Sequence, residues 1–531
     1  MKSTSSRERD LSSVTFVDSL RSLSPEGKPR DLLLRTAEIL DSWRPGQVVL
    51  LTAPTGYGKT TLSLSLANAV ISGNRELAER VIHVLPLRSI GDDLFIKAER
   101  TFRGLKPFRK YVGLQHMGRM DSPLLGRRFN ITTLDTFVLS FFKLPPYELH
   151  KVVNKYDAHY EVSRGFILSS LVVFDEVHLF LTETKSAIAF VTSLESLVES
   201  NVPVVLSTAT LPVSHLKELR KRVEAKGGEL LVVGPKADDS PKREVRVVPF
   251  TGDWLDKAKE LSEEKSLLIV TNTVKRAVEF FKDLKNAGLF PLLLHGRMTE
   301  RHRQNVLSRV LGEDRAMSPG TILVATQVIE AGVDISAGSM ITEVSPVESL
   351  LQRMGRVARY EGESGEVYVI RSSDNVYEGE KVDEAWKMVE NGKLEVPQGD
   401  VLKLDNSLHR ALWELHRNVF TGSKTALKLL EEECSFTRSG ELIKVVPEER
   451  LASVDEGDYL ALERGTLKRA KEKIVGGLRR GPEGVERVQL SEDFYRILEG
   501  GDPPCLSLWM MRNRIDSLVV KGYDEEVGFV G

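Results

Sequence analysis

Short runs of apolar residues recur along the first two thirds of the chain, and they do not alternate apolar with polar side chains. The runs occupy residues 48–51, 81–85, 171–174, 202–206, 267–270, 291–294 and 322–325. Uninterrupted apolar runs of this length are typical of strands buried on both faces, as in a parallel sheet. The pattern therefore predicts parallel sheets whose two faces are covered by helices.

Helical stretches lie between these runs. They occupy residues 60–71, 187–199, 274–287 and 301–311. A repeated alternation of strand and helix is typical of doubly wound α/β domains. The stretch 234–243 is rich in proline, charged and small residues, which indicates a linker between two such domains. Beyond residue 377 the strand pattern fades, and residues 402–415 and 424–433 read as amphipathic helices.

These patterns divide the chain into four parts. We predict a polar N-terminal segment, a first α/β domain, a second α/β domain and a mainly helical C-terminal extension. Their bounds are residues 1–28, 29–235, 236–377 and 378–531.

Composition excludes several classes of protein. The formal net charge is −2, from 74 lysine and arginine residues against 76 aspartate and glutamate residues, which excludes a uniformly basic nucleic-acid binder but leaves room for a local basic track. No apolar run approaches the ~20 residues that cross a bilayer, and the polar start shows no secretory signal. We therefore predict a cytoplasmic location without a membrane partner. Cys434 and Cys505 are too few for a four-cysteine metal site and can make at most one disulfide.

A phosphate-binding loop is predicted between residues 48–51 and the helical stretch 60–71. The string Ala53-Pro-Thr-Gly-Tyr-Gly-Lys-Thr60 departs from the pattern G-x-x-x-x-G-K-[ST] only by its first alanine. In such a loop the lysine lies between the β- and γ-phosphates and the threonine hydroxyl binds Mg²⁺. We predict an ATP site, with nucleotide contacts from Thr55, Gly56, Tyr57, Gly58, Lys59, Thr60 and Thr61.

An acidic pair follows another apolar run, in Leu171-Val-Val-Phe-Asp-Glu-Val-His178. Asp175 is placed to hold Mg²⁺ together with Thr60, and Glu176 is placed to orient and deprotonate the attacking water. Alone the pair is weak evidence, because carboxylates at strand ends are common. Together with the upstream loop it predicts hydrolysis of ATP with Mg²⁺ as the cofactor.

The string Asp175-Glu-Val-His178 resembles the box of the superfamily 2 DExH helicases, and other motifs of that family follow in order. The segment Thr208-Ala-Thr210 resembles the motif that couples hydrolysis to domain movement, in which His178 would also take part. The segment from Thr326 to Asp334 resembles the fifth motif and would add Gly332 and Asp334 to the nucleotide contacts. The resemblance implies an α/β fold with two tandem RecA-like domains that bind ATP in the cleft between them.

The segment Gln352-Arg-Met-Gly-Arg-Val-Ala-Arg359 matches the last helicase motif. Its spacing predicts that Arg356 and Arg359 lie one turn apart on one helix face. Brought against the γ-phosphate they would act as arginine fingers, an effect worth about 10³–10⁵ in rate. The predicted catalytic residues are Lys59, Asp175, Glu176, Gln352, Arg356 and Arg359.

The same resemblance implies contacts to a nucleic-acid backbone. The candidate residues are Arg88, Thr133, Asp135, Thr271, Asn272, His295, Arg297, Thr326 and Gln327. Hydroxyls, loop amides and guanidinium groups at strand ends can hold phosphates without reading sequence. Each residue alone is also compatible with a turn or a helix cap. The basic stretch 464–487 is open to two interpretations, a track for single-stranded DNA and a solvated surface.

Several motif variants resemble the CRISPR-associated helicase of type I interference. They include Ala325-Thr-Gln-Val-Ile-Glu330, Leu294-His-Gly-Arg297 and Thr133-Leu-Asp135. The resemblance implies an ATP-driven helicase that is recruited to a guide-RNA surveillance complex and moves along single-stranded DNA. That family often carries a metal-dependent HD nuclease domain ahead of the helicase. None of the ten histidines here is followed by aspartate, so we expect the HD nuclease to be a separate subunit.

Other functions remain compatible with the motifs. One is a DExH helicase of RNA processing or DNA repair, and another is a remodelling ATPase that does not separate strands. A degenerate helicase fold used as a scaffold disagrees with the intact Lys59, Asp175, Glu176, Arg356 and Arg359.

Overall fold

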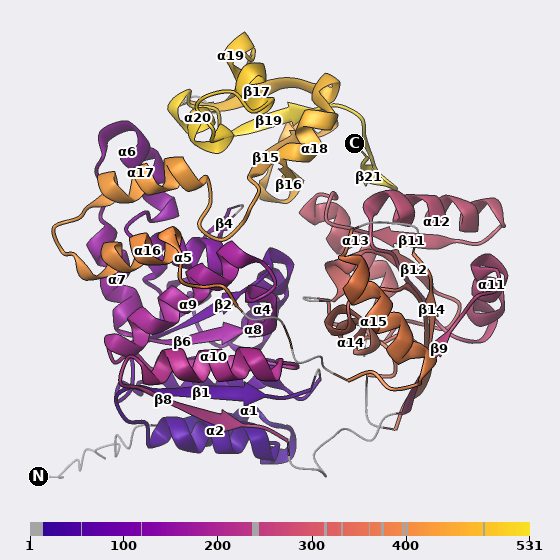
Figure 1. The fold of residues 1–531 in the computed structure, drawn as a ribbon, viewed down its shortest axis with the longest axis horizontal. Helices are drawn as coiled ribbons and strands as arrows, with labels where there is room; N and C mark the ends of the chain where they lie inside the picture. Colours follow the sequence, from indigo (N-terminus) through magenta and orange to yellow (C-terminus); the bar gives the residue numbers. More distant parts are fainter. Residues whose placement is uncertain are drawn as a thin grey trace, which may run out of the picture.

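The computed structural model describes residues 14–54, 56–117, 119–235, 244–312, 316–330, 333–359, 362–372, 376–395, 399, 402–481 and 484–530. Two α/β domains lie side by side, and a smaller C-terminal domain lies across one end of both (Figure 1). The predicted linker falls largely on residues 236–243, outside the described residues. Among the described residues, no helix is long and apolar enough to cross a membrane.

The first domain is built on an eight-stranded sheet in the order β4-β3-β5-β2-β6-β7-β1-β8, in which every pair is parallel except β3–β4. Its strands are β1 Gln47–Thr52, β2 Arg80–Leu85, β3 Val112–His116, β4 Arg119–Met120, β5 Phe129–Thr133, β6 Ser170–Asp175, β7 Val204–Thr208 and β8 Glu229–Val233. The predicted runs 48–51, 81–85, 171–174 and 202–206 coincide with β1, β2, β6 and β7. These strands are central and buried on both faces, which explains why they show as continuous apolar runs.

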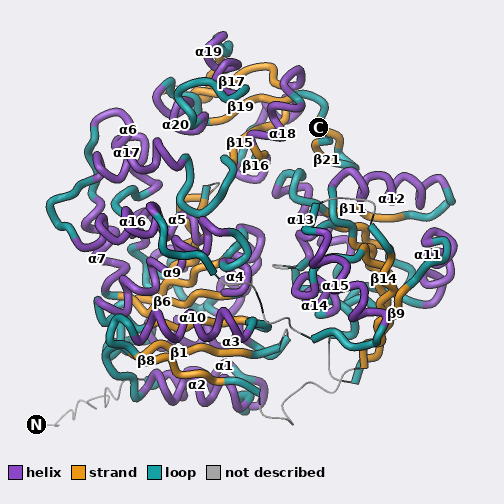
Figure 2. The backbone as a smooth tube through the Cα atoms, viewed as in Figure 1, coloured by secondary structure: helices purple, strands orange, loops and turns teal. Residues whose placement is uncertain are grey.

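Helices cover both faces of this sheet (Figure 2). They are α1 Phe16–Leu23, α2 Asp31–Asp41, α3 Lys59–Ile71, α4 Arg88–Thr101, α5 Leu134–Phe141, α6 Leu149–Lys155, α7 Tyr160–Leu168, α8 Val177–Phe180, α9 Thr184–Glu199 and α10 Val213–Glu224. Helix α1 buries Phe16 and Leu20 in the core of the domain. The domain therefore begins before residue 29, because part of the segment expected to be a polar extension is packed.

The second domain contains a six-stranded, all-parallel sheet in the order β11-β12-β10-β13-β14-β9. Its strands are β9 Glu244–Pro249, β10 Leu267–Val270, β11 Pro291–Leu294, β12 Ile322–Ala325, β13 Ser339–Glu343 and β14 Ser364–Ile370, and its helices are α11 Trp254–Glu264, α12 Val274–Asn286, α13 Glu300–Val310, α14 Val347–Met354 and α15 Gly379–Glu390. Helix α15 buries Ala385 and Trp386 in this domain's core, so the domain extends past residue 377. Two parallel sheets with helices on their faces confirm the predicted α/β class with two tandem RecA-like domains.

The prediction of a mainly helical C-terminal extension is wrong for its second half. The expected helices are present as α16 Ser407–Arg417 and α17 Ser423–Glu433, which pack on the first domain (Figure 1). The rest forms a five-stranded mixed sheet in the order β16-β15-β19-β17-β18. The elements are β15 Leu442–Pro447, β16 Leu460–Glu463, α18 Arg464–Arg469, β17 Ile474–Gly481, β18 Gly484–Val488, α19 Glu492–Leu498, α20 Leu506–Arg512, β19 Ser517–Val520, β20 Tyr523–Asp524 and β21 Gly528–Phe529.

The C-terminal domain is fastened to both α/β domains. A disulfide joins Cys434 at the end of α17 to Cys505 before α20, and so links the helices packed on the first domain to the C-terminal sheet. The pair β20–β21, here called the C-terminal hairpin (residues 523–529), reaches the second domain. Its Phe529 N–H donates to the Arg297 carbonyl at 2.9 Å.

Candidate nucleotide site and nucleic-acid interface

The phosphate-binding loop joins β1 to α3 at the carboxyl edge of the first sheet. Gly56 and Gly58 have φ of 79° and 97°, a left-handed backbone that favours glycine. Lys59 is the first residue of α3, so the free N–H groups of that helix face the loop. Tyr57 is buried and its ring is covered by the Arg30 guanidinium. Thr55 lies outside the described residues, whereas Thr60 and Thr61 begin α3 as predicted.

The acidic pair from β6 meets this loop. The Lys59 Nζ lies 3.1 Å from the Glu176 Oε1 and also donates to the Ala53 carbonyl at 3.4 Å. Both charged side chains are largely buried, with exposed fractions of 10% and 16%. The structure thus brings the predicted phosphate-binding lysine and the predicted general base into one cluster.

Asp175 is surrounded by donors. Ser207 Oγ and the Glu176 N–H both donate to its Oδ1, and His83 Nε2 lies 3.6 Å from its Oδ2. Burial alone would raise the pKa of this carboxyl, but His83, Lys59 and Ser207 together hold the pKa well below its usual range. Asp175 is therefore ionised, as a carboxylate that holds a divalent cation must be.

Glu176 adopts a strained backbone conformation. Its φ is 53°, although it is not glycine, and this left-handed geometry costs about 1–3 kcal/mol. The turn directs the side chain between Lys59 and His178, whose Nδ1 lies 3.5 Å from the Glu176 Oε2. Strain of this kind persists where the position of a side chain matters.

The three predicted coupling residues form a chain of hydrogen bonds. His178 Nδ1 is 2.9 Å from Thr208 Oγ1, and the Thr208 hydroxyl donates to the Thr210 carbonyl at 2.6 Å. Burial lowers the pKa of His178, so its ring is neutral at physiological pH. The chain connects the acidic pair to the loop after β7, at the boundary with the second domain.

The prediction that Arg356 and Arg359 share one helix face is wrong. Helix α14 ends at Met354, Gly355 caps it, and Ala358 has a φ of 45°. Arg356 donates from Nε to the Ile329 carbonyl at 2.8 Å and from Nη2 to the Glu330 carbonyl at 2.7 Å. Burial and the neighbouring Arg359 charge together lower the pKa of Arg356 to about 10.

Arg359 reaches the phosphate-binding loop of the other domain. A Cβ placed on Gly56 would lie 3.5 Å from the Arg359 Nε, so the guanidinium rests against this loop. Its Nη1 lies 2.6 Å from the Asp334 Oδ1. Asp334, which the motif predicts to contact the nucleotide, thus pairs with an arginine, and Gly332 lies outside the described residues.

Gln352 and its neighbour Arg353 are buried in α14. Gln352 lines a cavity of about 700 Å³ between the two α/β domains, together with His178 and Glu330. Arg353 is fully buried and bonds Asn272 Oδ1 at 3.0 Å, Thr342 Oγ1 at 2.9 Å and Glu330 Oε1 at 2.8 Å. It anchors the motif to the second sheet.

Four of the predicted nucleic-acid residues bond within the second domain. Thr271 Oγ1 donates to the Thr273 carbonyl at 3.1 Å, and Gln327 Nε2 donates to the Asn272 carbonyl at 2.6 Å. Thr271, Asn272 and Thr326 are buried. Gln327 thus fastens the loop after β12 to the loop after β10, which is the turn-and-cap alternative for such residues.

His295 is covered by the C-terminal hairpin instead of facing an open surface. Its Nε2 lies 2.9 Å from the Val527 carbonyl, and its Nδ1 accepts the Arg297 N–H at 3.1 Å. Gly528 packs so closely that a Cβ would lie 2.9 Å from the Arg297 carbonyl oxygen. The prediction that His295 contacts a nucleic-acid strand is therefore corrected. Its ring contacts the C-terminal hairpin, a segment distant in the sequence.

Acid should loosen this hairpin. Burial, together with the charges of Arg297, His302 and Arg303, lowers the pKa of His295 from 6.5 to about 4, against the Val527 hydrogen bond. Between these two values the released ring binds a proton that the docked ring does not, so docking weakens as pH falls. We expect the free energy of docking to fall by about 2 kcal/mol from pH 8 to pH 5. Hydrogen exchange of residues 523–530, corrected for its intrinsic pH dependence, measures this.

A His295→Gln variant keeps a donor and removes the titration, so its hairpin should exchange with much less dependence on pH. His416→Gln is the matched control, because burial also lowers the pKa of His416 to about 4 but its ring lies in α16 on the first domain. Equal pH dependence in His295→Gln and the unaltered protein would contradict this assignment.

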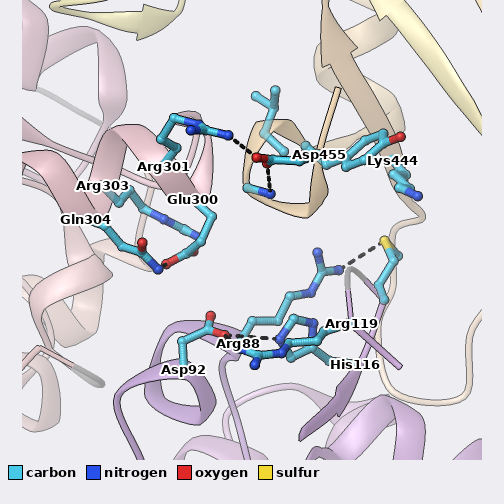
Figure 3. A pocket seen from close by; sticks show the side chains of 14 residues that line it. Arg88, Asp92, His116, Arg119, Glu300, Arg301, Arg303, Gln304, Lys444 and Asp455 are labelled. Carbon is cyan, nitrogen blue, oxygen red and sulfur yellow. Dashed lines mark hydrogen bonds and ion pairs between the residues drawn. The ribbon is translucent and has the colours of Figure 1, made fainter. Parts of the chain in front are cut away.

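A basic cavity of about 340 Å³ lies where all three domains meet, and Figure 3 shows the side chains that converge on it. This junction cavity is lined by Arg88, Asp92 and Arg119 of the first domain, Arg301 and Arg303 of the second, and Lys444 of the C-terminal domain. Arg88 is the one predicted nucleic-acid residue among these. Its Nη2 donates to the sulfur of Met117, a weak acceptor, at 3.2 Å.

Burial and the charges of Arg438 and Arg303 lower the pKa of Arg88 to about 10, and Asp135 opposes this shift. The side chain stays charged at neutral pH, at the cost of repulsion and desolvation that a bound anion would offset. Asp135 itself is paired with Arg438 at 3.0 Å and accepts the Thr437 hydroxyl, so it holds the C-terminal extension. The buried Thr133 lines an adjoining cavity of about 310 Å³.

The motifs missed several residues of these sites: Ser207, His83, Arg119, Arg303, Arg353 and Lys444. Ser207 and Arg353 stand beside predicted residues, so a closer look at the motif neighbours could have found them. The others come from segments far apart in the sequence, and no local pattern marks them.

Comparison with known proteins agrees with this geometry. Residues 35–219 match the family model described as DEAD/DEAH box helicase, and residues 263–362 match the one described as CRISPR-associated nuclease/helicase Cas3, C-terminal. The CRISPR-associated helicase Cas3 of Thermoproteus tenax is 27% identical over 344 residues, 63% of this chain and 57% of that protein. The CRISPR-associated nuclease/helicase Cas3 of Methanothermobacter thermautotrophicus is 26% identical over 502 residues, 85% of this chain and 54% of that protein.

The chain spans little more than half the length of these two curated relatives. Among solved structures, T. fusca Cas3 with ATP has a TM-score of 0.60 at 18% identity and covers 96% of this chain and 69% of that one. The DUF1998 helicase MrfA bound to DNA has a TM-score of 0.60 at 12% identity, over 96% of this chain and 69% of that one. At such identities these structures establish a shared fold.

Proposed function

We propose that the chain, whose residues 35–219 and 263–362 match a DEAD/DEAH box helicase model and a Cas3 C-terminal model, is an ATP-driven translocase and helicase on single-stranded DNA. The family supports a nucleic-acid-dependent ATPase with a CRISPR-associated role. The finer proposal is that the chain unwinds target DNA in type I interference. One observation carries the ATP-driven part of this proposal: the cluster of Lys59, Asp175 and Glu176 faces an arginine of the other domain across the cleft.

Each residue of that cluster has a distinct chemical task. Lys59 and the N–H groups of the loop bind the β- and γ-phosphates. Glu176 takes a proton from the attacking water, and its strained backbone holds the carboxylate in place for that transfer. Arg359 offsets the charge that develops on the γ-phosphate, and Arg356 adds a second positive charge behind it. Because these groups come from two domains, hydrolysis depends on how the domains meet.

The donors at the site fit Mg²⁺. The cation prefers oxygen ligands and is commonly held by one or two carboxylates plus substrate phosphates. Asp175 provides an ionised carboxylate, and Thr60 provides a hydroxyl at the start of α3. When bound, the ion neutralises charge on the β- and γ-phosphates.

We propose that the single-stranded DNA binds in the junction cavity. Its lining carries five cationic side chains against the three carboxylates of Asp92, Glu300 and Asp455, an excess of positive charge that fits a phosphate backbone, and a strand held there touches all three domains at once. Movement of one α/β domain against the other would then shift the strand.

Nucleic acid is expected to stimulate ATP hydrolysis selectively. Single-stranded DNA should raise kcat at least about tenfold and RNA of equal length less than about twofold. Arg88→Ala should raise the DNA concentration for half-maximal stimulation about tenfold, since a charge-assisted contact contributes about 1.5–3 kcal/mol. Steady-state ATPase titrations at two salt concentrations measure both effects.

Arg309→Ala, an exposed arginine on α13, is the matched control and should leave the titration unchanged. Stimulation by RNA alone would overturn the DNA assignment. It would favour RNA processing, in line with a relative in Phaeosphaeria nodorum, the pre-mRNA-splicing ATP-dependent RNA helicase PRP28, which is 27% identical over 169 residues.

The partners belong to the same proposal. We infer that a separate HD nuclease subunit cuts the unwound strand and that a guide-RNA surveillance complex delivers the DNA. In support, one structural neighbour is a CRISPR RNA-guided surveillance complex before nicking, with a TM-score of 0.55. If the chain alone nicks a supercoiled plasmid in the presence of ATP and divalent metal, the nuclease-in-trans proposal is wrong.

A further inference from the structure

One carboxylate joins the two α/β domains next to the ATP site. Lys97, on α4 of the first domain, has its Nζ 3.1 Å from the Asp334 Oδ2. The other oxygen of the same carboxylate, Oδ1, lies 2.6 Å from the Arg359 Nη1. Lys97 is also held within its own helix, with its Nζ 2.8 Å from the Asp93 Oδ2. No helicase motif predicted a role for Lys97.

This arrangement is largely shielded from solvent. The exposed fractions of the Lys97, Asp334 and Arg359 side chains are 22%, 22% and 14%. Ion pairs at this depth are screened less than surface pairs, and removing one partner leaves the others without their counter-charge. The contact is therefore able to fix the position of a neighbouring charged group.

Arg359 needs such fixing. Its neighbour Arg356 carries a like charge, and the two are close enough that the Arg359 charge lowers the pKa of Arg356. The Arg359 N–H donates to the Ser336 Oγ at 3.0 Å, in a stretch beyond the end of α14. The guanidinium nevertheless rests against Gly56 of the phosphate-binding loop. Asp334 supplies a counter-charge to this guanidinium, with its Oδ1 2.6 Å from the Arg359 Nη1.

We propose that Lys97 is a positioning residue, which holds the Asp334 carboxylate across the cleft and thereby seats Arg359 against the phosphate-binding loop. Lys97 itself touches neither the loop nor the acidic pair in any recorded contact among the described residues. It acts through Asp334. The proposal rests on the ATPase function proposed above and deepens it.

Helix α4 gives this contact a second consequence. Its first residue, Arg88, lines the junction cavity, and Lys97 lies nine positions further along the same helix. At 1.5 Å per residue the two are separated by about 13 Å along one rigid element. A phosphate drawn to Arg88 therefore pulls on the element that seats the arginine finger. This link offers a physical route by which a bound strand stimulates hydrolysis.

The test is kinetic. Lys97→Met keeps the length of the side chain and removes its charge, and it should lower kcat at saturating single-stranded DNA about 10- to 100-fold, since small misplacements of a catalytic group have effects of this size. The KM for ATP should change less than about threefold, because Lys59 and the loop are untouched. Lys97→Arg should restore kcat to within about fivefold. Arg100→Met, an exposed cation on the same helix, is the matched control.

A double-mutant comparison separates positioning from general destabilisation. In an Arg359→Ala background, Lys97→Met should lower kcat by less than about twofold more, because the group it positions is gone. Additive losses would overturn the proposal, and so would a Lys97→Met variant with unaltered kcat. If the unaltered protein hydrolyses no ATP with single-stranded DNA, the proposed function itself fails, and that result is distinct from both.

Discussion

Replacing Glu176 by glutamine is expected to lower kcat for ATP hydrolysis about 10³-fold or more while leaving the Kd for ATP within about threefold. Glutamine keeps the volume of the side chain and its place between Lys59 and His178. Its amide cannot take a proton from the attacking water, and a lost general base costs about 10²–10⁴-fold. Single-turnover hydrolysis measures the first quantity, and equilibrium titration with a fluorescent ATP analogue measures the second.

Two further variants bracket this result. Lys59→Ala should lose both binding and hydrolysis, because its ammonium group contacts the phosphates and the Glu176 carboxylate. Glu161→Gln, an exposed glutamate on α7 paired with Arg164, should change neither. Near-normal turnover by Glu176→Gln would show that another group activates the water.

The parallel sheets could be predicted from the sequence because their strands are buried on both faces. Strands β10, β11 and β12 coincide with the apolar runs 267–270, 291–294 and 322–325. The strands of the C-terminal sheet could not be predicted in this way. Strand β17 contains Gly476 and Gly477 and includes the half-buried Arg479, and its sheet mixes parallel with antiparallel pairs. Strands with one solvated face interrupt apolar residues with polar ones and glycine, so no continuous run marks them.

The candidate ATP site was likewise predictable from the sequence only in part. A phosphate-binding loop and an acidic pair after a strand are local arrangements, so the identities and spacing of the residues were enough to predict them. The contacts of His295 with Val527 and of Lys97 with Asp334 join residues 232 and 237 positions apart. Such contacts arise from the docking of whole domains, which has no local pattern. Arg356 and Arg359 were placed on a helix face because spacing alone does not show that Gly355 ends the helix.

Removing the Arg359 side chain is expected to lower kcat about 10³–10⁵-fold, the range for a lost arginine finger. The guanidinium lies against Gly56 and forms an ion pair with Asp334, so Arg359→Ala leaves the core intact and should keep Tm within about 2 °C. Arg359→Lys should restore little, since a point charge does not reproduce the planar fork of donors. Arg356→Ala is the informative contrast. It leaves the Ile329 and Glu330 carbonyls without their donor, so it should lower Tm as well as kcat. Turnover within tenfold of normal in Arg359→Ala would instead make Arg356 the finger.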